Sequence, residues 1–330
     1  MDFRAGVLGF VAVTRKLKWL AILGLLGRIP ALDPRLHCLT LLWFLILLDP
    51  IFWQSLRQSA GALCAMIAFR GKLPSKDGYV CRNDYILPFA GRWVAVNGGA
   101  DRKHSHSWSL PSQRYAYDFV VMDDEPKTGE GDRKALSGYF CHGMDVLAPA
   151  DGRVVEARDG RRDSRTNGAR AYCDGADIRG NFVVIDHGSG EFSLTAHLLP
   201  GSLSVKVGDE VRQGQPIARC GNSGNTSQPH IHFQLQSGRS FYSSAGLPVA
   251  FCGIEARGKP GYEKFDPRPR PEELPTVDGR TYIARGFEVW NGGSVSGGNC
   301  EEGGGDWAAG SAALPQPARS RYTRSIWKHR

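Results

Sequence analysis

The sequence predicts a mainly β fold in which an antiparallel, barrel-like sheet forms the body of the chain. Short runs rich in Val, Ile, Phe and Tyr follow one another at strand length, separated by Gly, Asp and Pro. The 330 residues include 41 Gly and 19 Pro, which favours many turns over a helical bundle. No segment between residues 80 and 255 has the 3.6-residue periodicity of an amphipathic helix.

The N-terminal region, residues 1–71, differs from the rest in composition and predicts apolar helices. Trp19–Leu26 and Leu39–Leu48 are almost continuously apolar, and basic residues such as Arg15 and Arg28 lie before or between them. The stretch from His37 to Trp53 is about the shortest length that spans a hydrocarbon core. We therefore expect a membrane anchor here, and the denser basic residues on its N-terminal side favour export of the remainder.

The polar, turn-rich part, residues 72–256, predicts the body of the fold. Its strand candidates are short and evenly spaced, as in antiparallel sheets. They are 93–96, 115–121, 145–148, 152–157, 181–186, 192–196, 216–219 and 230–235. The charged segment 123–140 is expected to be an insertion between two strands.

Residues 257–330 are rich in Pro, Gly and basic side chains, and we expect a partly disordered tail there. The formal net charge of +8 is mild for this length and suits an anionic surface such as a cell envelope. No series of aromatic residues interleaves with the basic ones, so a nucleic-acid partner is not expected.

Two histidines one residue apart, His230 and His232, are the strongest chemical signal. They lie in the run His-Ile-His-Phe-Gln-Leu, which alternates as a strand does, so both imidazoles point to one face. The loop Asn222-Ser-Gly-Asn-Thr-Ser-Gln-Pro precedes them. Two imidazoles about 7 Å apart on a strand suit a metal ligand beside a proton-transfer group.

Further motifs join this pair. Thr195-Ala-His197-Leu places another histidine at a strand end, and Val205-x-x-Gly-Asp-x-Val211 forms a hairpin element. With the histidine pair, these motifs resemble the lysostaphin/LytM-type zinc endopeptidases, which cut peptide cross-links of bacterial cell walls. The resemblance covers residues 104–235. It implies a LytM-type β catalytic domain, Zn²⁺ as the cofactor, a peptidoglycan or other peptide substrate, and a place in the cell envelope.

The resemblance also implies roles for individual residues. His232, as the second histidine of the pair, would bind zinc. His230 and His197 would flank the metal and serve proton transfer and oxyanion stabilisation.

The remaining two metal ligands are less directly assigned, because the sequence departs from the family pattern His-x-x-x-Asp. Cys141-His142-Gly-Met-Asp145 is one residue short of that spacing, and it aligns better with a later family element. Tyr117-Asp118-Phe has the expected strand aspartate, but Arg114 occupies the usual histidine position. We therefore expect Asp118 as a ligand together with a histidine from the upstream loop.

That upstream loop offers two histidines. His106 lies closer in sequence to the Asp118 strand and is preferred, with His104 in reserve. The pair of His142 and Asp145 stays open as the alternative ligand set.

Two other functions are compatible with parts of the sequence. Arg114, at the usual histidine position, is compatible with a catalytically silent domain of the same fold that binds the cell wall or activates other wall hydrolases. The Val-x-x-Gly-Asp-x-Val element also occurs in biotinyl and lipoyl carrier domains. Those domains present a modifiable lysine on a tight turn, and this sequence has no such turn nearby.

Overall fold

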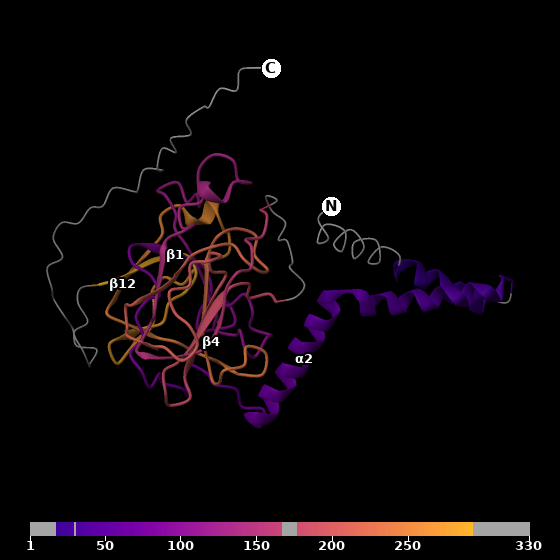
Figure 1. Cartoon of the computed structure of the whole chain (residues 1–330), viewed down its shortest axis with the longest axis horizontal. Helices are drawn as coiled ribbons and strands as arrows, with labels where there is room; N and C mark the ends of the chain where they lie inside the picture. The colour runs from indigo at the N-terminus through magenta and orange to yellow at the C-terminus, as the bar shows by residue number, and fades with distance from the viewer. Residues whose placement is uncertain (1–17, 30, 167–176, 293–330) are drawn as a thin grey trace, which may run out of the picture.

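The computed structural model describes residues 18–29, 31–166 and 177–292, and it confirms a mainly β, antiparallel fold (Figure 1). A ten-stranded sheet has the order β12-β15-β1-β2-β9-β6-β5-β4-β7, with β10 paired to β9. Its strands are β1 (Trp93–Asn97), β2 (Tyr117–Val120), β4 (Gly152–Arg158), β5 (Phe182–Asp186), β6 (Phe192–Ala196), β7 (Glu210–Val211), β9 (Ile231–Gln236), β10 (Gly246–Leu247), β12 (Ile254–Gly258) and β15 (Phe287–Asn291).

Two smaller sheets and two short 3-10 helices complete the domain. The smaller sheets have the orders β11-β14-β13 and β3-β8. Their strands are β3 (Asp145–Leu147), β8 (Pro216–Arg219), β11 (Phe251–Cys252), β13 (Thr276–Val277) and β14 (Arg280–Thr281), and the 3-10 helices are η3 (Leu136–Gly138) and η4 (Tyr262–Lys264).

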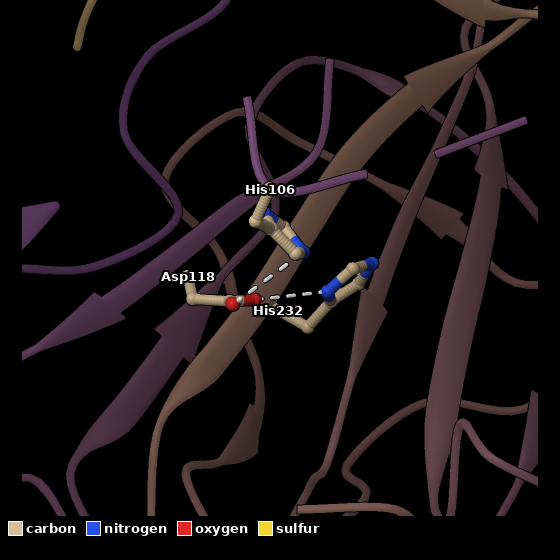
Figure 2. Close-up of side chains that lie close together, drawn as sticks. All are labelled: His106, Asp118 and His232. Atoms are coloured by element: carbon tan, nitrogen blue, oxygen red, sulfur yellow. Dashed lines mark hydrogen bonds and ion pairs between the residues drawn. The ribbon is translucent and has the colours of Figure 1, made fainter. Parts of the chain in front are cut away.

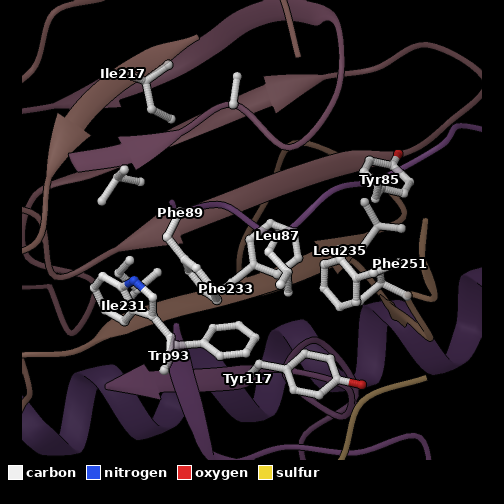
Figure 3. Close-up of a cluster of buried hydrophobic side chains, with 14 of the residues drawn as sticks. Tyr85, Leu87, Phe89, Trp93, Tyr117, Ile217, Ile231, Phe233, Leu235 and Phe251 are labelled. Atoms are coloured by element: carbon white, nitrogen blue, oxygen red, sulfur yellow. The ribbon is translucent and has the colours of Figure 1, made fainter. Parts of the chain in front are cut away.

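Strand β9 lies inside the large sheet, between β2 and β6, and all six of its residues are buried. Its alternation sends Ile231, Phe233 and Leu235 into the main hydrophobic core (Figure 3). The remaining residues of the strand face the opposite side, where Gln234 Nε2 donates to Gln236 Oε1 at 2.7 Å. The core face is therefore apolar, and the other face carries a row of polar side chains that begins with His232.

The register of the sheet aligns three residues across neighbouring strands. His232 pairs with Asp118 on β2 and with Ala196 on β6. His197 directly follows Ala196, and its φ of 64° turns the chain out of the strand. Strand pairing thus gathers residues that are far apart in the sequence on one face of the sheet.

The N-terminal region is helical, as expected. The 3-10 helices η1 (Lys18–Arg28) and η2 (Pro34–Leu48) pack side by side, with Gly24 directly against Thr40. They form a hairpin that extends away from the β domain, and the α-helix α2 (Pro50–Ala68) connects it to that domain (Figure 1). Many of their large apolar side chains are exposed, among them Leu41 and Phe44.

Within the described residues, no single helix has both the length and the hydropathy needed to cross a membrane. The segments Arg35–Leu48 and Phe52–Ala68 meet that requirement only as a pair, and the chain bends by 71° between them. The membrane anchor therefore stays a prediction.

Residues 257–292 differ from the expected tail. Strand β15 lies between β1 and β12 in the large sheet, with Trp93 opposite Val289. Arg285 is buried, and its guanidinium donates to the main-chain oxygens of Lys103 and Pro269. This segment is part of the folded domain because long-range strand pairing outweighs its Pro- and Gly-rich composition. The rest of the expected tail, residues 293–330, lies outside the described residues.

Candidate functional site

His106, Asp118 and His232 converge on one point above the polar face of the sheet (Figure 2). Their potential ligand atoms all lie within 4.8 Å of one another. His232 Nδ1 is 3.0 Å from Asp118 Oδ1, and His106 Nε2 is 3.7 Å from Asp118 Oδ2. Two imidazole nitrogens and a carboxylate at this spacing form a donor set suited to a divalent metal ion such as zinc.

Electrostatics keep the Asp118 carboxylate of this cluster ionised. Burial alone would raise the pKa of the Asp118 carboxyl, but three surrounding imidazoles hold that pKa well below its usual range. They belong to His106, His230 and His232. Burial lowers the pKa of His232, whereas its hydrogen bond to Asp118 raises it, and the net direction is upward. A buried carboxylate that stays charged is what a metal ligand requires.

Hydrogen bonds with neighbouring polar side chains orient the cluster. His232 Nε2 donates to Gln234 Oε1 at 3.0 Å, which leaves Nδ1 directed at Asp118. The amide nitrogen of Asn97 donates to Asp118 Oδ2 at 2.9 Å. Neither Gln234 nor Asn97 is among the site residues predicted from the sequence. The period of two along β9 could have revealed Gln234, whereas Asn97 reaches Asp118 only through the pairing of β1 with β2.

His197 and His230 lie together beside this cluster. Their ring centroids are 4.6 Å apart, and His197 is 5.8 Å from the His232 ring. Each donates from Nδ1 to a carbonyl oxygen at 2.8 Å, His197 to Ser223 and His230 to Gln228. Because a carbonyl oxygen can only accept, Nδ1 carries a proton in both rings, and in the neutral form of each ring Nε2 holds the lone pair.

The environment also sets the charge of His197. Burial is the largest effect, and the neighbouring His230 and His232 add to it, so the pKa of His197 falls well below its usual range. The imidazole is therefore neutral near neutral pH and free to accept a proton at Nε2.

The loop before β2 separates the two upstream histidine candidates. His104 points away from the cluster, because its Nδ1 pairs with the Asp101 carboxylate at 2.8 Å. Two residues later His106 points at Asp118, with 24% of its side chain exposed. Arg114 contacts Trp108 of the same loop. Its guanidinium lies 4.8 Å over the Trp108 ring and donates to the Trp108 carbonyl.

The alternative ligands lie elsewhere. His142 Nε2 is 3.0 Å from Asp163 Oδ2, and Asp145 is an exposed residue of β3. In the part of the chain that the structure describes, the only group of three or more His, Cys, Asp or Glu residues with metal-ligand spacing is His106, Asp118 and His232. The geometry thus favours the upstream loop over the Cys141–Asp145 segment.

A cavity of about 390 Å³ opens over the site. Its lining includes all five predicted site residues, His106, Asp118, His197, His230 and His232. The structure therefore brings the predicted metal-binding and proton-transfer residues to one solvent-accessible space.

Comparison with known proteins locates the family within the chain. Residues 138–243 match peptidase family M23. The matched range contains His197, His230 and His232 but begins after His106 and Asp118, so the match alone does not identify the first two ligands.

Several characterised proteins are similar to parts of the chain. Murein hydrolase activator EnvC of Escherichia coli is 36% identical over 112 residues, which cover 34% of this chain and 22% of that protein. Peptidoglycan DD-endopeptidase ShyA of Vibrio cholerae is 41% identical over 56 residues, which cover 17% of this chain and 13% of that protein. The chain thus spans well under half the length of these relatives.

Among solved structures, a zinc-containing peptidase from Vibrio cholerae is 20% identical, with a TM-score of 0.31 and coverage of 50% of this chain and 39% of that one. The family assignment therefore rests on the sequence match. The chain contains a peptidase family M23 domain, at residues 138–243.

Proposed function

We propose that the chain is a zinc metalloendopeptidase that hydrolyses peptide bonds in the stem or cross-link peptides of peptidoglycan. One observation carries this proposal. The ligand atoms of His106, Asp118 and His232 converge within 4.8 Å at a cavity where two further histidines present Nε2 lone pairs.

The donor set fits zinc. Two imidazoles and one carboxylate leave a coordination position open, as catalytic zinc sites require. His232 is already oriented for the role, because Gln234 Oε1 accepts a hydrogen bond from its Nε2–H and Nδ1 points at the cluster. A zinc ion held there supplies a Lewis acid that lowers the pKa of bound water and polarises a carbonyl group.

His197 and His230 would handle protons. Each Nε2 lone pair can accept a proton from the attacking water, and the resulting N–H can stabilise the developing oxyanion or protonate the leaving amine. The Ser223 and Gln228 carbonyls hold the two rings in the required tautomer through Nδ1. The depressed pKa of His197 keeps it ready as a base rather than as a cation.

These roles predict different effects for the metal-binding histidines and for the proton-transfer histidines. We expect His197→Ala or His230→Ala to lower hydrolysis about 100-fold or more, the usual contribution of general acid–base catalysis, while zinc remains bound. Zinc content and hydrolysis of purified cell-wall peptides would be measured on the same preparations. Full hydrolysis in both variants would remove these histidines from the mechanism.

A second candidate is a catalytically silent domain that activates other wall hydrolases. The similarity to proteins named murein hydrolase activators favours it. A silent activator would need neither zinc nor the Nε2 lone pairs, so it would keep its function in the His197 and His230 variants. The complete set of site residues supports the enzyme over the activator.

The substrate class and location rest on two supports. A relative is named a peptidoglycan DD-endopeptidase, and the chain carries a formal net charge of +8 that suits an anionic envelope. We further propose that the hairpin of η1 and η2 anchors the chain in the membrane, with the catalytic domain exported. The apolar side chains exposed on that hairpin, such as Leu41 and Phe44, support this.

The anchor can be tested by charging its exposed side chains. Leu41→Asp together with Phe44→Asp is expected to move much of the protein from the membrane fraction to the soluble fraction, because charges within the hydrocarbon core are costly. Val207→Asp, at an exposed apolar residue of the β domain, is the matched control and should leave the distribution unchanged. Equal membrane recovery of all three proteins would contradict the anchor.

A further inference from the structure

Helix α2 forms one wall of the cavity over the candidate site, although it lies outside the M23 match. Gln54 and Gln58 of this helix line the same cavity as His106, His197 and the other site residues. The two glutamines are four residues apart, so their side chains lie one above the other on the same helix face. A segment from the N-terminal region thus contributes directly to the space in which a substrate would bind.

The helix is fitted closely to the domain along that face. Gly61 lies on the same face of α2 as Gln54 and Gln58, and a Cβ atom at this position would lie only 2.2 Å from the Tyr242 carbonyl oxygen. Ala65, one turn further on, is fully buried. In contrast, Leu63 and Ile67 on other faces of α2 are more than 60% exposed. Close backbone packing at Gly61, rather than apolar burial, therefore sets the position of the glutamines over the cavity.

Both glutamines have polar atoms without partners. Gln54 Oε1 and Gln58 Nε2 are buried, yet neither makes a hydrogen bond. Buried polar atoms are nearly always paired in folded proteins, and each exception calls for an explanation. Together they offer one acceptor and one donor, and a peptide main chain carries the complementary N–H and C=O groups. Exchanging the oxygen and nitrogen of both carboxamides would leave the same complement, one acceptor and one donor.

A helix that blocks the site would be arranged differently. A blocking segment would fill the cavity and bond to the metal-binding or proton-transfer residues. Here about 390 Å³ remains open, and the two unpaired atoms make no bond to the site histidines or to Asp118. The arrangement is that of a wall facing an open cleft.

We propose that Gln54 and Gln58 are substrate-positioning residues, which hydrogen-bond to the main chain of the peptide next to the bond that is cleaved. When each carboxamide turns toward the cavity that its residue lines, Gln54 Oε1 accepts from a peptide N–H, and Gln58 Nε2 donates to a peptide C=O. This inference rests on the proposed peptidase function. It assigns part of the substrate cleft to the N-terminal region, so cleavage requires α2 docked on the domain.

The test uses the full chain with Gln54→Leu, Gln58→Leu and the double variant. Leucine has a similar size but no hydrogen-bonding group, so packing of α2 is retained. We expect each single variant to raise KM about 5- to 10-fold with kcat nearly unchanged, the effect of one lost hydrogen bond made equally in the ground and transition states. Zinc content should stay constant, and the melting temperature should stay constant or rise. Ser59→Ala, at an exposed position of the same helix, is the matched control.

Hydrolysis would be followed on a purified cross-linked muropeptide, and affinity for the uncleaved muropeptide would be titrated in parallel. An unchanged KM and affinity in the double variant would overturn the proposal. A higher kcat/KM in the double variant, or in Gly61→Leu, which displaces α2 from Tyr242, would also overturn it and identify α2 as a cover. If the parent chain binds but does not cleave, the peptidase proposal fails, and the affinities alone decide the role of the glutamines.

Discussion

Replacing His232 by alanine is expected to abolish both zinc binding and peptide hydrolysis. His232 lies within the buried strand β9, with Nδ1 3.0 Å from Asp118 and Nε2 held by Gln234. Its removal leaves two of three ligand side chains and an Asp118 carboxylate that has lost its nearest imidazole. We expect hydrolysis to fall to background. This loss is larger than the decrease of about 10- to 100-fold that is typical when a residue hydrogen-bonded to a metal ligand is replaced.

Gln234→Ala is the control for His232→Ala, and a smaller effect is expected from it. Because Gln234 touches His232 but lies outside the ligand cluster, its loss should weaken zinc affinity about 10- to 100-fold and leave measurable hydrolysis at saturating zinc. Zinc would be quantified by elemental mass spectrometry and folding by circular dichroism. A folded His232→Ala protein that keeps stoichiometric zinc and full hydrolysis would show that the metal site lies elsewhere.

The second large effect is expected for His106, which, like Asp118, is a proposed ligand outside the residues that match the family. His106→Ala should remove zinc and reduce hydrolysis to background, because no other histidine in the described structure reaches Asp118 from that loop. His104→Ala should keep zinc, since the His104 imidazole is bound to Asp101. His142→Ala should also keep zinc, since its imidazole pairs with Asp163.

The same zinc and hydrolysis assays decide among these three variants. Loss of zinc in the His142 variant, with zinc retained in the His106 variant, would transfer the metal site to the Cys141–Asp145 segment. Loss of zinc in the His104 variant alone would mean that the loop rearranges on metal binding, with Asp101 releasing His104.

The sheet that carries the candidate site follows from local sequence patterns. The alternation His-Ile-His-Phe predicts that the two histidines share a face. His230 directly precedes β9, and it lines the same cavity as His232, with Ile231 and Phe233 in the core. The apolar residues around Asp118 predict a strand in the same way, and β2 is that strand. Such alternation can be recognised in the sequence because a strand with one buried face needs an apolar residue at every second position.

Other features depend on contacts between distant segments. Strand β15 pairs with β1, so Trp93 and Val289 become neighbours, and nothing local in the Pro-rich segment after residue 257 indicates this. The choice between His104 and His106 rests on Asp101, which holds the His104 ring. The position of α2 over the cavity rests on the close approach of Gly61 to Tyr242. Such contacts are fixed by the folded structure rather than by propensity.

Mass spectrometry of muropeptides released from purified peptidoglycan tests the proposed peptidase activity most directly. The zinc-loaded chain is expected to convert cross-linked muropeptides into products that have gained one water at a peptide bond, and a metal chelator should stop this conversion. Unchanged muropeptides in the presence of stoichiometric zinc would contradict the peptidase, and digestion that required an added wall hydrolase would identify the chain as an activator.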